Sequence, residues 1–235
     1  MQSATVPATV SPRPRRIAAR QFLATLPLFA GLAPVHLDLL AQSTSEHHLP
    51  RGSVIFTRGD ACTGLHIVIY GDVKLSIVAH GAEKVLALVG PGASVGEAAL
   101  FMERAYGKRA ETLADSMLLH IAGPALFALI ERDPVLARRL LASMGRRLHG
   151  LMDDVESYTL RSGSQRIVHY LLKDDPSQGG HVMLAARKNT IASRLSLSPE
   201  YFSRVLHELA HRGMVAISGR SITILDIAGL RAYEG

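Results

Sequence analysis

RKNTIASRLSLSPEYFSRVL, residues 187 to 206, has the spacing of two short helices joined by a tight turn. Thr190 is a candidate cap for the first helix. Ser198, followed directly by Pro199, has the pattern expected where a second helix begins. Apolar residues then recur along one side of that second helix, at Phe202, Val205, Leu206 and Leu209. The stretch therefore predicts a helix-turn-helix.

The other face of the second helix carries Glu200, Ser203 and Arg204. A glutamate accepts a hydrogen bond from the cytosine amino group, and an arginine donates two to guanine. We therefore predict that these three residues read DNA bases, although a surface helix with an ordinary salt-bridged face has the same composition. Phosphate contacts position a protein without reading sequence. The residues expected to make them are Arg187, Lys188, Ser198 and Arg220.

The segments around the helix-turn-helix complete a domain. GMVAISGRSITILD, residues 213 to 226, holds two alternating apolar stretches joined around Ser218 and Gly219, which predicts a β-hairpin wing. SQRIVHYLL, residues 164 to 172, predicts a preceding helix, and the polar KDDPSQGG after it predicts a loop. Residues 162–235 are therefore expected to form a winged helix-turn-helix DNA-binding domain.

Residues 133–161 have the pattern of one long helix, opened by Asp133 as the cap and Pro134 at the first position. Apolar residues follow at alternating steps of four and three, which is a heptad seam. Such a seam favours contact with the same helix of a second subunit, and packing against the chain's own body is the alternative. The dimer seam is predicted to consist of Leu141, Met144, Leu148, Leu151, Val155 and Tyr158.

Residues 22–132 consist of short alternating apolar runs broken by glycines, which is typical of an antiparallel β-barrel or sandwich. The runs are SVIF, GLHIVIYG, VKLSIVAHG, KVLALVG and MLLHIAG. The adjacent pair His47 and His48 is expected in a turn before the first of them. Residues 1–21 lack periodicity and are rich in Pro, Ser and Thr, so they are expected to form a flexible tail. The fold class is therefore α+β.

The composition limits the partners and the chemistry. The net charge of +6 and the isoelectric point near 9.8 suit an anionic polymer. The single cysteine, Cys62, excludes an iron–sulfur cluster, which needs about four thiolates. No apolar run reaches the roughly 20 residues of a membrane span, and we expect a cytoplasmic protein without membrane contact. Catalytic nucleophile and metalloprotease motifs are absent, so an enzyme is not predicted.

The order of sensor domain, long helix and winged helix-turn-helix resembles the CRP/FNR superfamily of bacterial transcription regulators over nearly all of residues 22–230. GSVIFTRGD and GLHIVIYGDVKLSIV resemble its β-roll, which folds like a cyclic-nucleotide-binding domain. GPGASVGEAALF resembles its ligand cassette, and PEYFSR resembles its recognition-helix motif. The resemblance implies a homodimer that binds a palindromic site in double-stranded promoter DNA and recruits or blocks RNA polymerase.

Within the superfamily, the spacing of Glu200, Ser203 and Arg204 is similar to the FNR branch. That similarity implies a site of the TTGAT-N4-ATCAA kind. The pattern is most similar to that of the Dnr-type denitrification regulators.

The resemblance leaves the signal open. Gly96 and Glu97 match the cassette that holds a cyclic nucleotide, but Lys108 and Arg109 stand where nucleotide binders carry an arginine followed by a short hydroxyl. On the long helix, Leu151 and Met152 replace the pair of hydroxyl residues that reads the adenine, which disfavours cyclic AMP. A haem sensor of nitric oxide is left by elimination, and the apolar Leu151 and Met152 suit contact with a porphyrin. Its candidate axial ligands are His36, His47, His48 and His66.

Two alternatives to this hypothesis stay open. One is a cyclic-nucleotide-responsive regulator of the same superfamily. The other is a cyclic-nucleotide-binding module that acts through protein contacts, which would have no use for a base-reading helix and a wing.

Overall fold

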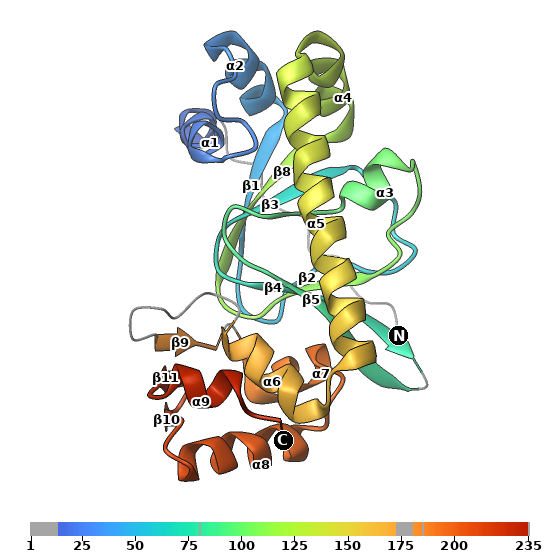
Figure 1. Cartoon of the computed structure of the whole chain (residues 1–235). Helices are drawn as coiled ribbons and strands as arrows, with labels where there is room; N and C mark the ends of the chain where they lie inside the picture. The colour runs from blue at the N-terminus through green and yellow to red at the C-terminus, as the bar shows by residue number, and fades with distance from the viewer. Residues whose placement is uncertain (1–13, 80, 173–180, 185, 235) are drawn as a thin grey trace.

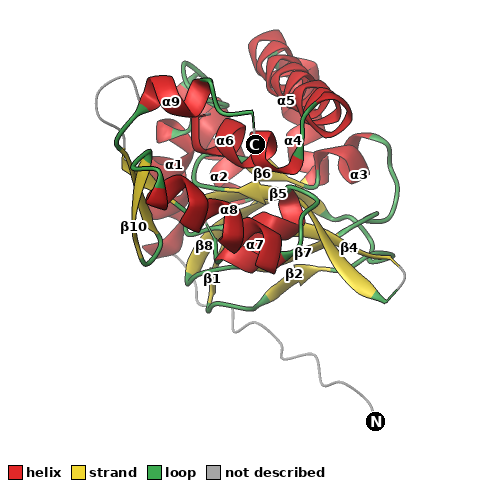
Figure 2. Ribbon diagram, turned by 60° about the horizontal axis from the view of Figure 1, so that its bottom comes forward, coloured by secondary structure: helices red, strands yellow, loops and turns green. Residues whose placement is uncertain are grey.

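A computed structural model of the chain describes residues 14–79, 81–172, 181–184 and 186–234. Two β-sheets with covering helices form the upper part of Figure 1, and the long helix α5 runs beside them to the winged helix-turn-helix below. Figure 2 views the molecule from this lower end, where α7 and α8 lie in front of the sheets. The predicted α+β architecture is confirmed.

The β-roll consists of two four-stranded antiparallel sheets, in the orders β1-β8-β3-β6 and β2-β7-β4-β5. Alternation along β3 sends Val68 toward the core between the sheets and Ile67 toward the covering helices. The strands are β1 Thr44–Leu49, β2 Val54–Phe56, β3 Gly64–Tyr70, β4 Val73–Ala79, β5 Ala82–Val89, β6 Ser94–Val95, β7 Arg109–Thr112 and β8 Ser116–Ala122.

The five apolar runs that predicted strands correspond to β2, β3, β4, β5 and β8. The expectation of a turn at His47 and His48 is wrong, because both residues lie in β1 and pair with Leu118 and Met117 of β8. The β8 strand, apolar on both faces, draws this polar segment into the sheet as an edge strand by offering it backbone hydrogen bonds.

Helices α1 Pro14–Thr25, α2 Pro34–Gln42 and α4 Gly123–Arg132 contribute to the core on the outer side of the first sheet. The prediction of a tail up to residue 21 is wrong from Pro14 onward, because α1 begins there. Ala19 and Leu23, one helical turn apart, are both buried. Arg20 forms an exposed ion pair with Asp38 of α2, with 2.5 Å between Nε and Oδ1.

The long helix α5 spans Pro134–Leu160, so the predicted helix is confirmed. Its cap is Asp133, whose carboxylate accepts a hydrogen bond from the Val135 amide at 3.0 Å. Leu136 and Leu140 are buried at the start of α5. The apolar residues beyond them face solvent in this single chain. The exposed fractions are 69% for Leu141, 62% for Leu148 and 64% for Val155.

The C-terminal part has a core of its own. Its helices are α6 Gly163–Leu172, α7 Lys188–Arg194, α8 Pro199–His211 and α9 Ile227–Arg231, and its strands are β9 His181–Met183, β10 Val215–Ser218 and β11 Ser221–Ile224. The hairpin of β10 and β11 confirms the predicted wing, and β9 adds a third strand beside β11. The polar segment KDDPSQGG lies outside the described residues. No helix in the described ranges combines the length and apolarity needed to cross a membrane.

Candidate DNA-binding surface and sensor site

The first helix of the helix-turn-helix begins earlier than predicted. The Arg187 carbonyl accepts hydrogen bonds from the amides of Thr190 and Ile191, at 2.9 and 3.1 Å. These bonds make Arg187 the N-cap and place Thr190 inside α7, so the prediction of Thr190 as the cap is wrong. Sequence preference favoured the threonine, but the backbone already turns before it.

The start of α8 is as predicted. Ser198 caps the helix by accepting a hydrogen bond from the Tyr201 amide at 3.1 Å, and Pro199 occupies the first turn. The side chains predicted to face inward are buried in the core of the C-terminal domain, namely Phe202, Val205, Leu206 and Leu209. This packing fixes which face of α8 points outward.

The outward face of α8 carries the predicted base-reading residues. Glu200 and Arg204 are exposed, and Ser203 is half-buried. The Arg204 guanidinium lies 5.0 Å from the centre of the Tyr201 ring, a cation–π contact that holds it near the start of the helix. Glu200 lies in the first turn, where the helix dipole favours an anion. The helix thus presents a hydrogen-bond acceptor and a bidentate donor to the outside.

The residues predicted to contact phosphate are placed differently from one another. Arg187 and Ser198 are exposed at the starts of α7 and α8, and Lys188 is half-buried. Arg220 lies at the turn of the wing, but its guanidinium donates two hydrogen bonds to the Leu184 carbonyl, at 3.1 and 2.6 Å. These bonds tie Arg220 to its own domain although the residue is exposed, and its contact with phosphate stays a prediction.

In the sensor, the predicted ligand residue Glu97 already has partners within the chain. Gly96 has a φ of 103° and precedes the short helix α3, Glu97–Phe101. The Glu97 carboxylate accepts a hydrogen bond from the Ser94 hydroxyl at 2.5 Å and pairs with Arg147 of α5 at 3.2 Å. Arg147 also donates to the Ser94 carbonyl at 3.0 Å. The cassette is therefore tied to the long helix through this arginine.

The sequence prediction missed Arg147, although it lies one helical turn before Leu151 and on the same side of α5. Leu151 and Met152 are exposed in the single chain. Lys108 is exposed, and Arg109 makes two hydrogen bonds to Glu111 of its own strand, at 3.1 and 2.9 Å. Of the two cations predicted for an anionic ligand, Lys108 is therefore exposed and Arg109 is paired with Glu111, while Glu97 is paired with Arg147.

The histidines proposed as haem ligands lie in different places. The His36 Nδ1 atom is 2.9 Å from the carboxylate of Asp133, at the start of α5. At a rise of about 1.5 Å per residue, Leu151 is about 27 Å further along that helix. The His48 Nδ1 atom lies 3.4 Å from the Tyr70 hydroxyl. His36 therefore cannot serve a haem that contacts Leu151 of the same chain.

His66 and His47 point into the roll. The His66 ring lies 4.7 Å from that of His120, its cross-strand partner, and the His47 ring lies 6.2 Å from His120. Burial, followed by the neighbouring His120 and His47, lowers the pKa of His66 to about 3. Phe56 and Tyr106, stacked at 3.7 Å, fill the space beside His66. These residues do not fit a haem group, because a porphyrin would have to displace the stacked rings.

Within the part of the chain that the structure describes, no group of three His, Cys, Asp or Glu side chains has the geometry of a metal site.

A β-roll, a long helix with an exposed apolar side and a winged helix-turn-helix with an exposed recognition face define a class of sensor-coupled DNA-binding regulators. A cyclic nucleotide-binding domain model matches residues 46–133, and a Crp-like helix-turn-helix domain model matches residues 165–233. The chain belongs to the CRP/FNR superfamily of transcription regulators.

The similarity to known members covers most of the chain. The Cyclic AMP receptor protein of Thermus thermophilus is 33% identical over 204 residues, which cover 86% of this chain and 94% of that protein. Transcriptional activator protein anr of Pseudomonas aeruginosa is 26% identical over 194 residues, 80% of this chain and 79% of its own length. A solved Ruegeria pomeroyi protein, described as a cyclic nucleotide binding protein, is 30% identical with a TM-score of 0.61, covering 93% and 98% of the two chains.

Proposed function

We propose that the protein is a homodimer that reads an inverted repeat of the TTGAT-N4-ATCAA kind in double-stranded promoter DNA. The observation that carries the proposal is the outer face of α8, where Glu200 and Arg204 are exposed. The opposite face of α8 is buried in the core of the C-terminal domain. An α-helix with such a face fits the major groove, where each base pair presents a distinct pattern of donors and acceptors.

The exposed apolar side of α5 supports the homodimer. Leu141, Leu148 and Val155 follow the heptad spacing and are all more than half exposed. Burying each such side chain is worth about 1.5 to 3 kcal/mol, so a second α5 is a favourable partner. Tyr158 differs from the rest of the predicted seam, because its hydroxyl already contacts α7 of its own chain. A dimer built on α5 would present two α8 helices to successive major grooves, beside RNA polymerase at a promoter.

A gel-shift titration tests the base-reading role. We expect Glu200→Ala to lose roughly 1 to 3 kcal/mol of discrimination between a TTGAT-N4-ATCAA duplex and a scrambled one. The control is Glu208→Ala on the same helix, because Glu208 pairs with Arg212 one turn further on. The control should keep the full discrimination. Equal weakening of Glu200→Ala on both duplexes would contradict base reading.

For the signal, we propose a small ligand bound at the cassette beside Glu97. A haem that reports nitric oxide, in the control of denitrification, stays a prediction from the resemblance, and the positions of the histidines do not support it. Cyclic AMP is the alternative, supported by the cyclic nucleotide-binding domain match and by the name of the Thermus relative. The pairing of Arg109 with Glu111 and the exposure of Lys108 weigh against it.

Two titrations of the purified protein separate these ligands. We expect no saturable heat with cyclic AMP in calorimetry, because Arg109 is paired with Glu111 and Glu97 is paired with Arg147. Saturable binding would establish the cyclic-nucleotide-responsive alternative. With haemin, a defined Soret band that shifts on addition of nitric oxide would support the haem prediction, and an unchanged free-haemin spectrum would remove it.

A further inference from the structure

The carboxyl end of α7 is closed by three side chains from three other elements. Lys84 of β5 donates to the Ser193 carbonyl, Tyr158 of α5 to the Arg194 carbonyl, and Arg166 of α6 to the Leu195 carbonyl. The last two bonds measure 2.5 and 2.7 Å. The final carbonyls of a helix lack partners within it and carry partial negative charge, so cations and hydroxyl donors stabilise them. We call Lys84, Tyr158 and Arg166 the α7 end cap.

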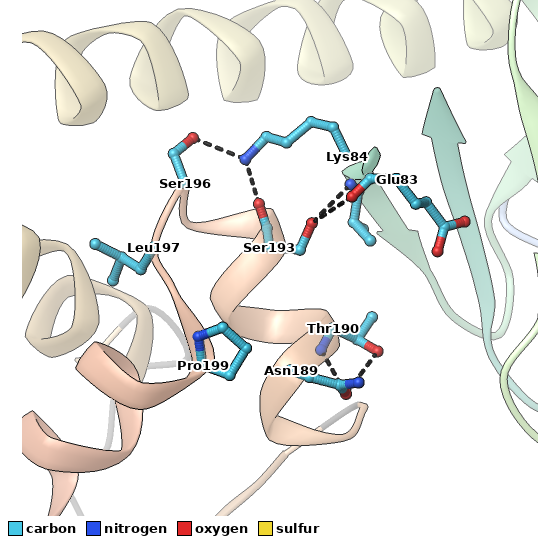
Figure 3. A pocket seen from close by; sticks show the side chains of 9 residues that line it. Glu83, Lys84, Asn189, Thr190, Ser193, Ser196, Leu197 and Pro199 are labelled. Carbon is cyan, nitrogen blue, oxygen red and sulfur yellow. Dashed lines mark hydrogen bonds between the residues drawn. The ribbon is translucent and has the colours of Figure 1, made fainter. Parts of the chain in front are cut away.

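Lys84 is the member of the end cap that comes from the β-roll. Figure 3 shows its ammonium group between the Ser193 carbonyl and the Ser196 hydroxyl, the second at 2.8 Å. The Val85 amide, next in the chain, donates to the Ser193 hydroxyl at 3.0 Å. Burial and the neighbouring Arg194 and Arg166 lower the pKa of Lys84. The roll therefore holds α7 by directional bonds from one partly desolvated cation and one backbone amide.

Ser196 has an unusual backbone because it follows the end of α7 in a Schellman cap, where the Leu197 amide donates to the Ala192 carbonyl at 2.9 Å. Its φ is 59°, in the left-handed region that favours glycine. A glycine would adopt this turn more easily, but it would offer Lys84 no hydroxyl. The side chain at Ser196 thus gives the roll a second attachment point on the helix-turn-helix.

The rest of the contact between β5 and the helix-turn-helix is open. A pocket of about 660 Å³ lies beside the end cap, between Glu83 of β5 and Asn189 and Pro199 of the helix-turn-helix (Figure 3). Leu88 and Leu113 of the roll also contact the C-terminal core. Apolar contacts are non-directional, whereas the hydrogen bonds of Lys84 have a required geometry. The directional contacts between the roll and α7 are therefore those of Lys84 and the Val85 amide, and we expect them to set the angle between the two.

We propose that Lys84 is a positioning residue that fixes α7, and with it α8, at the angle a dimer needs to reach two half-sites together. The inference rests on the proposed function. A two-fold reader must place its recognition helices about 34 to 36 Å apart, one turn of DNA. Without the Lys84 contact, α7 could rotate relative to the roll. One α8 would then bind its half-site, while the other would not align with the second half-site. Lys84 then governs which half-site spacing is accepted, without touching a base.

The full-length protein is compared with Lys84→Met and Lys84→Arg on duplexes whose two half-sites are separated by three, four or five base pairs, and on a single half-site. We expect the unchanged protein to prefer the four-base-pair spacing by roughly tenfold or more. Lys84→Met should reduce this preference to about threefold or less, with affinity for the single half-site within about twofold. Lys84→Arg, which keeps a cationic donor, should restore the preference.

Ser196→Gly removes the second acceptor of Lys84 and relieves the positive φ. We expect it to unfold at an equal or higher temperature and still to lose spacing preference. Combined with Lys84→Met, it should add little, because the two residues share one contact. This variant separates positioning from folding, since a folding defect would lower the unfolding temperature and weaken all duplexes alike.

An unchanged spacing preference in Lys84→Met would overturn the inference, as would tighter binding of the four-base-pair site, which would mean that Lys84 restrains an inactive arrangement. Equal weakening on every duplex at an unchanged unfolding temperature would assign Lys84 to a phosphate contact, and at a lowered unfolding temperature to folding alone; either result would contradict positioning. Failure of the unchanged protein to bind any of the duplexes would remove the proposed function, and the inference with it.

Discussion

The outer face of α8 and the cassette of the β-roll carry the same kinds of side chain, a glutamate and arginines, with opposite surroundings. Glu200 and Arg204 face outward from a helix whose opposite face is buried. Glu97 is held by Arg147 and Ser94 within its own chain, and Arg109 is held by Glu111. On α8, these residue types therefore indicate a partner outside the chain. In the roll, the same residue types are paired within the chain and do not identify a ligand.

The largest effect is expected on α5, where the exposed side chains are apolar rather than polar. Leu148→Glu places a charge in the predicted seam of α5 and removes an apolar side chain from both copies. We expect the dimer to weaken by about 3 to 6 kcal/mol, measured by sedimentation equilibrium, because each buried leucine contributes about 1.5 to 3 kcal/mol. The circular dichroism spectrum should stay unchanged, since Leu148 is already exposed in the single chain.

Arg146→Glu is the matched control for the seam, because Arg146 is exposed and lies outside the heptad stripe. It should leave the dimer intact. If Leu148→Glu also stayed dimeric, the open apolar side of α5 would not be the interface.

The second effect concerns the interior of the roll, where His66 should make the stability of the protein depend on pH. The pKa of His66 is lowered to about 3, so the folded protein keeps this histidine neutral while the unfolded chain takes up a proton near pH 6.5. Stability is therefore lost as the pH falls from about 6.5 toward 3, at about 1.4 kcal/mol per pH unit. Between pH 7 and 4.5, we expect the unchanged protein to lose about 2 to 3 kcal/mol more than His66→Phe in urea unfolding.

His149→Gln, on the exposed surface of α5, serves as the control for this titration and should lose as much stability as the unchanged protein. Protein concentration must be equal in all samples, because a dimer's stability depends on it. If His66→Phe and the unchanged protein lost the same stability, His66 would take up its proton in the folded protein as it does in the unfolded chain.

The smallest effect concerns the start of α8, which positions the open recognition face. Ser198→Ala removes the cap on the Tyr201 amide and should lower the free energy of unfolding by about 1 kcal/mol. Ser198→Gly should lower it by only a few tenths of a kcal/mol, because glycine also suits this backbone position. Equal losses in the two variants would mean that the cap contributes little.

Local patterns made the DNA-binding half predictable. The cap and proline at Ser198, the apolar spacing of α8, the heptads of α5 and the alternation of the wing each lie within a short stretch. The strands β6 and β7 were missed because they are short, and β7 alternates charged with small residues. Helix α4 was missed because its apolar run also resembles a strand.

Contacts between distant parts of the chain left no such pattern. Glu97 meets Arg147, Arg194 meets Asp154, and Lys84 meets Ser193 across long sequence separations. Each of these residues, read in its own segment, is an ordinary surface charge or hydroxyl. Their roles follow from the packing of the roll against α5 and α7, which residue spacing does not specify. The sequence therefore predicted the partner of α8 better than the partner of the roll.

The apolar stripe on α5 also has a consequence for how the protein matures after synthesis. If Leu141, Leu148 and Val155 stay in water until a second chain arrives, the last step of assembly is a collision between two folded chains. Such a step follows second-order kinetics, so it slows as the protein becomes scarce, while the roll and the helix-turn-helix form at a rate independent of concentration. At low expression the cell would hold a pool of folded single chains, and the onset of regulation would lag behind the accumulation of protein.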